Sequence, residues 1–332
     1  MSDLKRREFI TLLGGAAAWP LLIRSFAASA QPSGKVYRIG FLGVFSYAEY
    51  RRQVDALRTG LSQLGYEEGK NIVIHYRWAE GNYDRLHELV TELVKLDVDV
   101  LVAHSTPGAL AAKQATSTIP IVAYSGDPVA AGLVASLARP GGNLTGMTFF
   151  FAEICAKRVE LIKEAISTLT RVAVFVNPAN PSHALALAAM QRTASALGVE
   201  LVPIEVKARD DIAVAIAMVA TRGAPALVAI EDPLFISNAR QIAGLALHSR
   251  LPMIGFKPQA EAGALMDYGV DLTDNYSRLA SFVDKILKGA PPADLPIERA
   301  VKFEVVVNLK SAKTLGIELP TSVLLRADEV IE

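Results

Sequence analysis

From residue 36 onward, short apolar runs alternate with longer stretches that mix apolar and polar residues. The first of these runs have the length of strands and lie at 36–42, 72–76, 98–103 and 119–124. The stretches between them carry apolar residues three and four apart, as in the helix predicted to bury Val54, Leu57, Leu61 and Leu64. This alternation predicts repeated strand–helix units around a parallel sheet.

Local signals indicate where the helices of this first half begin. Ser46 and Glu49 have the spacing of a capping box, and Asn82 is a suitable cap for the helix that follows the second strand. Pro128 directly follows Asp127, and proline is favoured at the first position of a helix. We therefore expect a further helix to open at Pro128, with Asp127 as its cap.

The same pattern restarts after residue 150. Predicted strands at 172–176, 199–204 and 226–230 alternate with predicted helices at 181–197, 211–222 and 235–248. A second copy of one architecture implies an α/β protein with two Rossmann-like lobes, each built on a parallel sheet and joined by a multi-strand hinge. We assign 35–148 plus about 275–292 to the first lobe, and 149–274 plus about 293–332 to the second.

Polar or aromatic residues follow three predicted strands of the first lobe. Because parallel strands end at one edge of a sheet, and open α/β sheets bind ligands at that edge, these residues are candidates for a site. Ser46, Ser105, Thr106 and Asp127 have an alternative role as ordinary helix caps. A cap can still share its helix N-terminus with an anionic ligand. The candidates are Phe45, Ser46, Ser105, Thr106, Ser125 and Asp127.

The second lobe supplies the opposite wall by the same geometry. Adjacent aromatic residues near 149 cannot all face one core, because neighbouring side chains of a strand alternate. Core packing of these rings and helix capping by Asn180 are the alternative readings. The candidates are Phe149, Phe150, Asn177, Asn180, Glu231, Asp232 and, at the end of the apolar run 264–268, Tyr268.

Several sequence stretches resemble one known family. They are Gly126-Asp127-Pro128-Val129, the run from Ala138 to Gly146 (ARPGGNLTG), Asn308-Leu309-Lys310 and the end from Arg326 to Glu332 (RADEVIE). The chain is similar in these stretches to substrate-binding components of ABC transporters, in the group that includes tryptophan- and tyrosine-binding members. The resemblance spans nearly the whole chain after residue 30, and it implies a type I periplasmic binding fold.

The resemblance implies an importer component that captures a small organic ligand, such as an aromatic or hydrophobic amino acid or a related carboxylate. Helix N-termini and hydroxyls of the first lobe would hold a carboxylate, and Phe45 and Phe149 the apolar part. Its partners would be that ligand and an ABC permease in the membrane, and we expect a monomer. A sensor that docks on a membrane receptor remains an alternative function, and a neighbouring sensor kinase gene would favour it.

Composition and motifs also bear on whether the protein binds nucleic acid, catalyses a reaction or holds a metal ion. The 34 basic and 34 acidic residues balance, so we expect no nucleic-acid partner. His87-Glu88-Leu89-Val90-Thr91 starts like a zinc-protease helix but has Thr in place of the second histidine. The five histidines are scattered and Cys155 is a single cysteine in an apolar helix, which we expect to be buried. We expect no enzyme activity, no cofactor and no metal site.

The first thirty residues have the pattern of an export signal. Lys5, Arg6 and Arg7 precede Glu8-Phe9-Ile10, which resembles a twin-arginine motif, and a moderately apolar stretch follows. The small residues 28–30 provide a signal peptidase site, so cleavage is expected near Ala30. These features predict a periplasmic protein, exported by the twin-arginine route.

Overall fold

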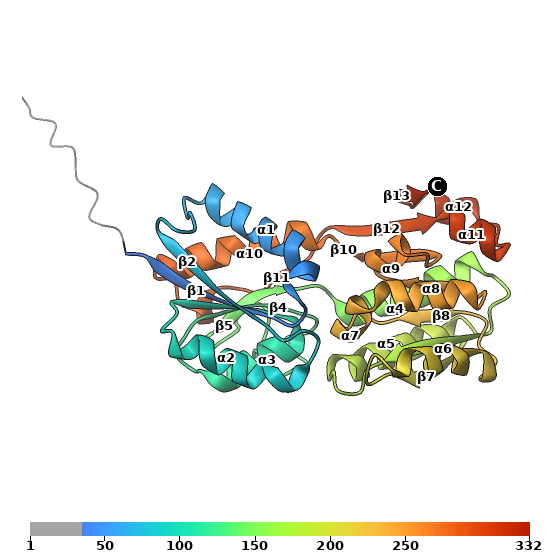
Figure 1. Cartoon of the computed structure of the whole chain (residues 1–332), viewed down its shortest axis with the longest axis horizontal. Helices are drawn as coiled ribbons and strands as arrows, with labels where there is room; N and C mark the ends of the chain where they lie inside the picture. Colours follow the sequence, from blue (N-terminus) through green and yellow to red (C-terminus); the bar gives the residue numbers. More distant parts are fainter. Residues whose placement is uncertain (1–34) are drawn as a thin grey trace, which may run out of the picture. The chain divides into compact units, whose positions relative to one another are not determined.

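The computed structural model describes residues 35–332, which form two α/β lobes (Figure 1). The export signal predicted for residues 1–30 lies outside this described part. Among residues 35–332, every helix is too short or too polar to cross a bilayer. The prediction of two lobes, each with its own sheet, is confirmed.

The first lobe is built on a six-stranded sheet with the order β11-β5-β4-β3-β1-β2. Every neighbouring pair in this sheet is parallel, as the strand–helix pattern predicts. Its strands are β1 (Tyr37–Gly43), β2 (Ile72–Trp78), β3 (Val100–His104), β4 (Ile121–Ser125), β5 (Leu144–Thr148) and β11 (Glu298–Arg299).

Helices cover both faces of this sheet. Helices α1 and α10 pack together on one face, and α2 and α3 pack on the other (Figure 1). The predicted capping box is present, because Ser46 and Glu49 exchange hydrogen bonds at the start of α1. The helices are α1 (Tyr47–Gln63), α2 (Leu86–Lys95), α3 (Ser105–Ala115) and α10 (Leu272–Leu287), with short 3-10 turns η1 (Tyr83–Arg85) and η2 (Pro292–Asp294).

The second lobe is built on a seven-stranded sheet with the order β13-β12-β10-β9-β8-β6-β7. This sheet is not entirely parallel as predicted, because β12 runs antiparallel to β10. Strand β10 leads out towards the first lobe and β12 returns from it, so the two run in opposite directions. The strands are β6 (Arg171–Val176), β7 (Glu200–Glu205), β8 (Leu227–Ala229), β9 (Met253–Gly255), β10 (Met266–Val270), β12 (Phe303–Asn308) and β13 (Glu329–Ile331).

The helices of the second lobe enclose two separate apolar cores, one on each face of the sheet. Cys155 is fully buried in the core beneath α4, as predicted. The single helix predicted at 235–248 is broken at Asn238, whose side-chain amide donates to the Leu234 carbonyl. The helices are α4 (Phe151–Ala165), α5 (Ser182–Ala196), α6 (Asp211–Thr221), α7 (Pro233–Ser237), α8 (Ala239–His248), α9 (Lys257–Glu261), α11 (Leu309–Leu315) and α12 (Thr321–Leu324).

The helix predicted to open at Pro128 is absent, and this prediction was wrong. Residues 128–132 form a hydrogen-bonded turn instead. The turn ends at Gly132, whose φ of +68° is left-handed and cannot continue a right-handed helix. Asp127 still accepts hydrogen bonds from the amides of Val129 and Ala130, so it caps a turn rather than a helix.

The chain crosses between the lobes three times, after β5, after β10 and after β11. Two crossings are bonded to each other, since the Lys302 ammonium lies 2.6 Å from a carboxylate oxygen of Asp271. The last crossing comes later than the expected boundary near 293, because β11 still pairs with β5 in the first lobe. The other expected lobe boundaries stay predictions.

Candidate functional site

A cavity lies between the two lobes, and we call it the interlobe cavity. Its lining comes from α1, β3, β4 and the first crossing on one side, and from the loop after β8, α9, β10 and β12 on the other. It encloses about 800 Å³ of empty space, part of it open to solvent. Clefts between two lobes are common places for small-molecule sites.

The first lobe contributes a wall of packed rings, which we call the aromatic wall. It consists of Phe45, Tyr50, His104, Tyr124 and Phe149. The ring centroids of Phe45 and Tyr50 lie 4.9 Å apart, and those of Tyr124 and Phe149 also lie 4.9 Å apart. These distances are typical of favourable aromatic pairs. The wall therefore offers an apolar, rigid surface for the body of a ligand.

His104 is the polar member of this wall, and its charge state follows from burial. Its Nδ1 is hydrogen bonded to the hydroxyl of Tyr276, which lies on α10 behind the cavity. Desolvation by burial lowers the pKa of His104 from 6.5 to about 3. His104 is therefore neutral near pH 7 and presents no cation to a ligand.

The second lobe contributes an acidic wall, made of Glu231 and Asp267 on either side of Gly269. Arg158 of α4 lies behind it, fully buried, and donates to Glu231 Oε1 at 2.8 Å and to the carbonyl oxygens of Ala229 and Tyr268. Asp267 Oδ1 and Glu231 Oε2 are buried and have no hydrogen-bond partner among the described residues. The wall thus contains two acceptor atoms that the described residues leave unsatisfied.

A smaller pocket of about 350 Å³ adjoins the interlobe cavity and shares Phe45, His104, Phe149 and Glu231 with it. We call it the polar pocket, because the hydroxyl residues Ser105, Thr106 and Ser182 line it at the starts of α3 and α5. Ser105 has a φ of +66°, a backbone conformation that is rare for residues other than glycine. Where such a conformation does occur, it is often at a ligand site. The start of α3 carries partial positive charge, which suits a carboxylate.

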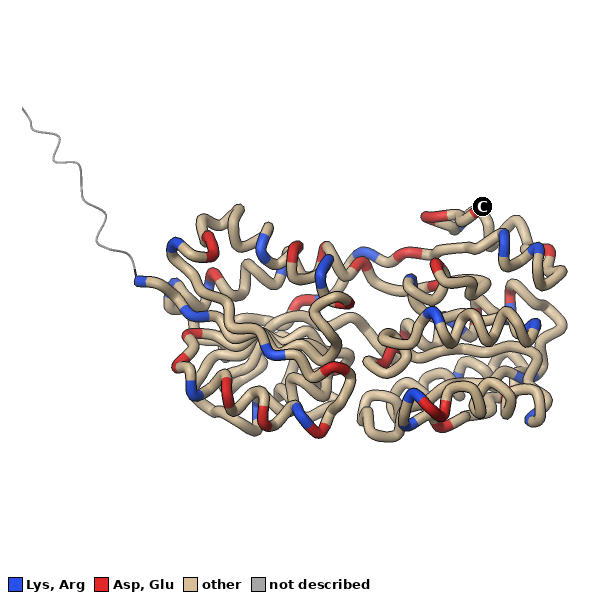
Figure 2. Tube along the Cα trace, viewed as in Figure 1, with Lys and Arg blue, Asp and Glu red and all other residues tan. Residues whose placement is uncertain are grey.

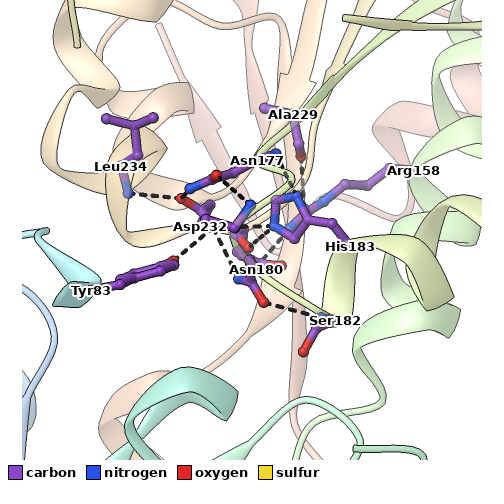
Figure 3. Close-up of polar contacts among 11 residues, drawn as sticks. Tyr83, Arg158, Asn177, Asn180, Ser182, His183, Ala229, Asp232 and Leu234 are labelled. Carbon is purple, nitrogen blue, oxygen red and sulfur yellow. Dashed lines mark hydrogen bonds and ion pairs between the residues drawn. The ribbon is translucent and has the colours of Figure 1, made fainter. Parts of the chain in front are cut away.

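Asn180 and Asp232 line the polar pocket, and they belong to a hydrogen-bonded cluster around Asp232 (Figure 3). The Asp232 carboxylate accepts from the side-chain amides of Asn177 and Asn180 at 3.0 and 2.9 Å, and from the Leu234 amide at 3.0 Å. It also accepts from the hydroxyl of Tyr83 at 2.9 Å. Since Tyr83 belongs to the first lobe, this bond links the two lobes directly.

The structure brings together some of the side chains predicted for the site. Phe45, Phe149 and Glu231 line the interlobe cavity. Four others line the polar pocket instead, namely Ser105, Thr106, Asn180 and Asp232. The other six do not line either space, and they are Ser46, Ser125, Asp127, Phe150, Asn177 and Tyr268.

Each of these six has a different position in the fold. Ser46 caps α1, and Asn177 holds Asp232. Phe150 lies against the guanidinium of Arg299, and the ring of Tyr268 stacks on Phe303. Asp127 caps the turn at 128–132, and Ser125 is buried at the end of β4.

Sequence reasoning missed several of the lining residues. Tyr50 lies on a helix face that the pattern assigns to the core, and Tyr124 is the residue just before the predicted polar end at Ser125. His104 begins the polar end that contains Ser105 and Thr106, but it was not among the candidates. Asp267 carried the clearest unused signal, because a carboxylate inside an apolar run of strand length is rarely buried without a reason. No group of three or more side chains in residues 35–332 is arranged to hold a metal ion.

Charged side chains of both signs are distributed over the part of the chain that the structure describes. Lys and Arg are interspersed with Asp and Glu along both lobes, as Figure 2 shows.

Comparison with known proteins gives relatives that bind amino acids. A tyrosine-binding protein of Clostridioides difficile (strain R20291) is 25% identical over 288 residues, covering 86% of this chain and 83% of the relative. The solved ABC domain in complex with L-Trp from Streptococcus pneumonia is 26% identical, with a TM-score of 0.83 and coverage of 89% and 99%.

A third comparison bears on the arrangement of the lobes. The ligand-free, open structure of a substrate binding protein with adhesive properties from Clostridium difficile is 25% identical and covers 89% and 99%, yet its TM-score is only 0.66. At nearly equal identity and coverage, this chain therefore lies closer to the ligand-bound structure than to the open one.

The family assignment rests on a match that spans nearly the whole described chain. The model of the family described as ABC transporter substrate binding protein matches residues 40–331. The two lobes, the cavity between them and the signature stretches agree with it. This chain is a member of the ABC transporter substrate binding protein family.

Proposed function

We propose that this protein is the extracytoplasmic substrate-binding component of an ABC importer. The observation that carries the proposal is the interlobe cavity, with an aromatic wall from one lobe and polar groups from the other. Such a cavity binds a ligand with both lobes at once, so that the ligand stabilises the closed arrangement. A permease in the membrane would recognise that closed arrangement and accept the ligand from it.

The proposed ligand is an aromatic or hydrophobic amino acid, or a related carboxylate. The aromatic wall suits an apolar side chain, and the polar pocket suits a carboxylate at the start of α3. The relatives named as tyrosine-binding and as bound to L-Trp support this class. The protein would bind its ligand without turnover, act as a monomer and reach the periplasm through the predicted signal at residues 1–30.

A thermal-shift screen of the chain from Gln31 onward tests the ligand class. Amino acids, aromatic acids, nucleosides and sugars would each be added, since a ligand that binds only the folded state raises stability by about 2.7 kcal/mol at a hundredfold excess over its Kd. We expect a shift with aromatic or hydrophobic amino acids or their related acids. Shifts confined to sugars or nucleosides would contradict the proposed class.

The site itself is tested with Phe149→Ala, measured by calorimetry with the ligand found in the screen. Loss of a ring that stacks on Tyr124 and lines the cavity should weaken binding about tenfold. Phe303→Ala is the matched control, because Phe303 stacks on Tyr268 outside both spaces. Equal affinities of the two variants would contradict the proposed site.

The importer role needs a separate measurement in cells. Removing the gene should abolish high-affinity uptake of the identified ligand, and supplying it again should restore uptake. Normal uptake together with a lost transcriptional response to the ligand would point to a sensor instead.

A further inference from the structure

Asp267 is a buried carboxylate whose charge is not matched inside the protein. Asp267 is only 2% exposed and lines the interlobe cavity. Its Oδ1 atom has no hydrogen-bond partner among the described residues. An isolated buried carboxylate is costly, so such a group either binds a cation or takes up a proton. Within the fold, the candidate cations are Arg158 and Lys257.

Both of these cations are already engaged. Arg158 donates to Glu231 and to two backbone carbonyls, and its hydrogen bonds do not include Asp267. Lys257 of α9 lies 3.3 Å from Glu304 of β12 and 2.8 Å from Glu329. When Asp267 is ionised, the single charge of Arg158 cannot balance both Glu231 and Asp267, and the acidic wall carries one surplus negative charge. Desolvation by burial raises the pKa of Asp267 well above its usual range, as expected for an unmatched carboxylate.

Gly269 leaves the acidic wall open to the cavity. A methyl group at this position would lie 3.5 Å from Asp267 Oδ1, 3.6 Å from Glu231 Oε1 and 3.8 Å from an Arg158 nitrogen. Because glycine has no side chain, a ligand group can occupy that position and reach the carboxylates. Across the same cavity lies the aromatic wall, whose ring faces also attract cations.

We propose that the interlobe cavity recognises a positively charged nitrogen of its ligand, held at Gly269 between the carboxylates of Glu231 and Asp267. The ligand is therefore an amine or an amino acid, and a carboxylic acid that lacks the amino group is excluded. This inference rests on the proposed function, since it assigns the ligand class of the same cavity. Arg158 fixes Glu231 in place, and Asp267 supplies the charge that the ligand neutralises.

Matched sets of three probes test the inference with the wild-type protein. The first set is tryptophan, tryptamine and indole-3-propionate, and the equivalent sets carry phenol, phenyl and isobutyl groups. Calorimetry should detect binding for a member with an amino group, and at least tenfold weaker binding for its deaminated acid. Whether tryptophan or tryptamine binds more tightly separates an amino-acid ligand from a simple amine.

Two variants and a control locate the subsite. Asp267→Asn keeps the shape and removes the charge, so affinity for the amino-bearing probe should fall by about 10- to 100-fold. Gly269→Ala should block the same probe, and its backbone is not in the left-handed region, so the fold has no reason to change. Glu160→Gln removes a carboxylate from the exposed pair with Lys157 on α4 and should bind as the wild type does.

A pH series gives a readout that a purely structural role would not produce. Because a cation binds ionised Asp267, affinity for tryptamine should rise with pH and binding should release a proton. The charged groups that face Asp267 are Arg158, Glu231, Lys257 and Glu304. Asp267→Asn leaves these four groups in place, yet it should remove the dependence of the affinity on pH.

Three results would overturn the inference. One is equal binding of a deaminated acid and its amino counterpart, which would leave the binding function intact. Another is unchanged affinity in both Asp267→Asn and Gly269→Ala. The third is a folded protein that binds no member of the four sets, in which case the broader screen alone would decide the proposed function.

Discussion

At the scale of single residues, His104 makes the stability of the protein depend on pH. Burial holds its pKa at about 3 in the folded protein, whereas an unfolded histidine has a pKa near 6.5. The unfolded chain therefore binds the extra proton as the pH falls below 6.5, and the contribution to stability that is full at neutral pH is lost. The loss attributable to His104 should reach about 2 kcal/mol at pH 5.

His104→Asn tests this, because an amide oxygen can accept from Tyr276 but does not titrate. Urea unfolding at pH 7 and pH 5 should show a smaller acid loss in the variant than in the wild type. His183 is also buried and its pKa is also lowered, so the variant should still lose some stability in acid through His183. His87→Asn, at an exposed position of α2, should keep the wild-type difference. An unchanged difference in His104→Asn would contradict the assignment.

The residue scale also shows how far the site could be predicted. Residues that directly follow strands, such as Phe45, Ser105 and Glu231, were found because parallel strands deliver their ends to one edge. Tyr50 and Asp267 could not be found in this way. They lie inside a helix and a strand, and only the packing of two lobes brings them to the cavity.

At the scale of elements, Gly146 determines how β5 packs on β4. Its φ is +133°, and a methyl group here would lie 2.0 Å from the Ala123 carbonyl oxygen. Gly146→Ala should destabilise the protein by about 3 kcal/mol, since it adds both strain and a backbone clash. Gly244→Ala on α8 is the control, because, apart from its chain neighbours and the nearby backbone of α8, no described atom lies within 4 Å of its added methyl group.

The two substitutions should have opposite signs in chemical denaturation. Alanine is favoured over glycine inside a helix by about 1 kcal/mol, so Gly244→Ala should stabilise the protein slightly. A Gly146→Ala variant as stable as the wild type would show that β4 and β5 can separate without cost.

The elements were largely predictable, because the spacing of apolar residues encodes them locally. The helix at 128–132 was mispredicted, since Pro128 and Asp127 are equally good at opening a turn, and only Gly132 shows that the turn ends. The antiparallel β12 could not be predicted from its own residues. Its direction follows from the path of the chain through the other lobe.

At the scale of the whole molecule, direct bonds between the lobes of residues 35–332 include one hydrogen bond and one ion pair, in addition to the three crossings. Tyr83 donates to Asp232 across the cleft, and Arg52 of α1 lies 4.0 Å from Glu261 of α9 as an exposed ion pair. Exposed pairs of this kind contribute little. The Tyr83 bond reaches a carboxylate that is 1% exposed, so it should be the stronger of the two.

Tyr83→Phe should therefore shift the protein towards an open arrangement. Asp232 keeps its three donors from Asn177, Asn180 and Leu234, so the second lobe itself should stay intact. Losing a hydrogen bond made only in the closed arrangement should weaken ligand binding about tenfold. X-ray scattering of the ligand-free variant should give a larger radius of gyration than the wild type, and calorimetry should give the weaker affinity.

Tyr47→Phe is the control for this change, because Tyr47 is exposed at the start of α1 and does not line the cavity. If Tyr83→Phe matched this control in both scattering and affinity, the bond to Asp232 would not contribute to closure. Closure would then depend on the ligand alone, which must bridge the aromatic and acidic walls to hold the two lobes together.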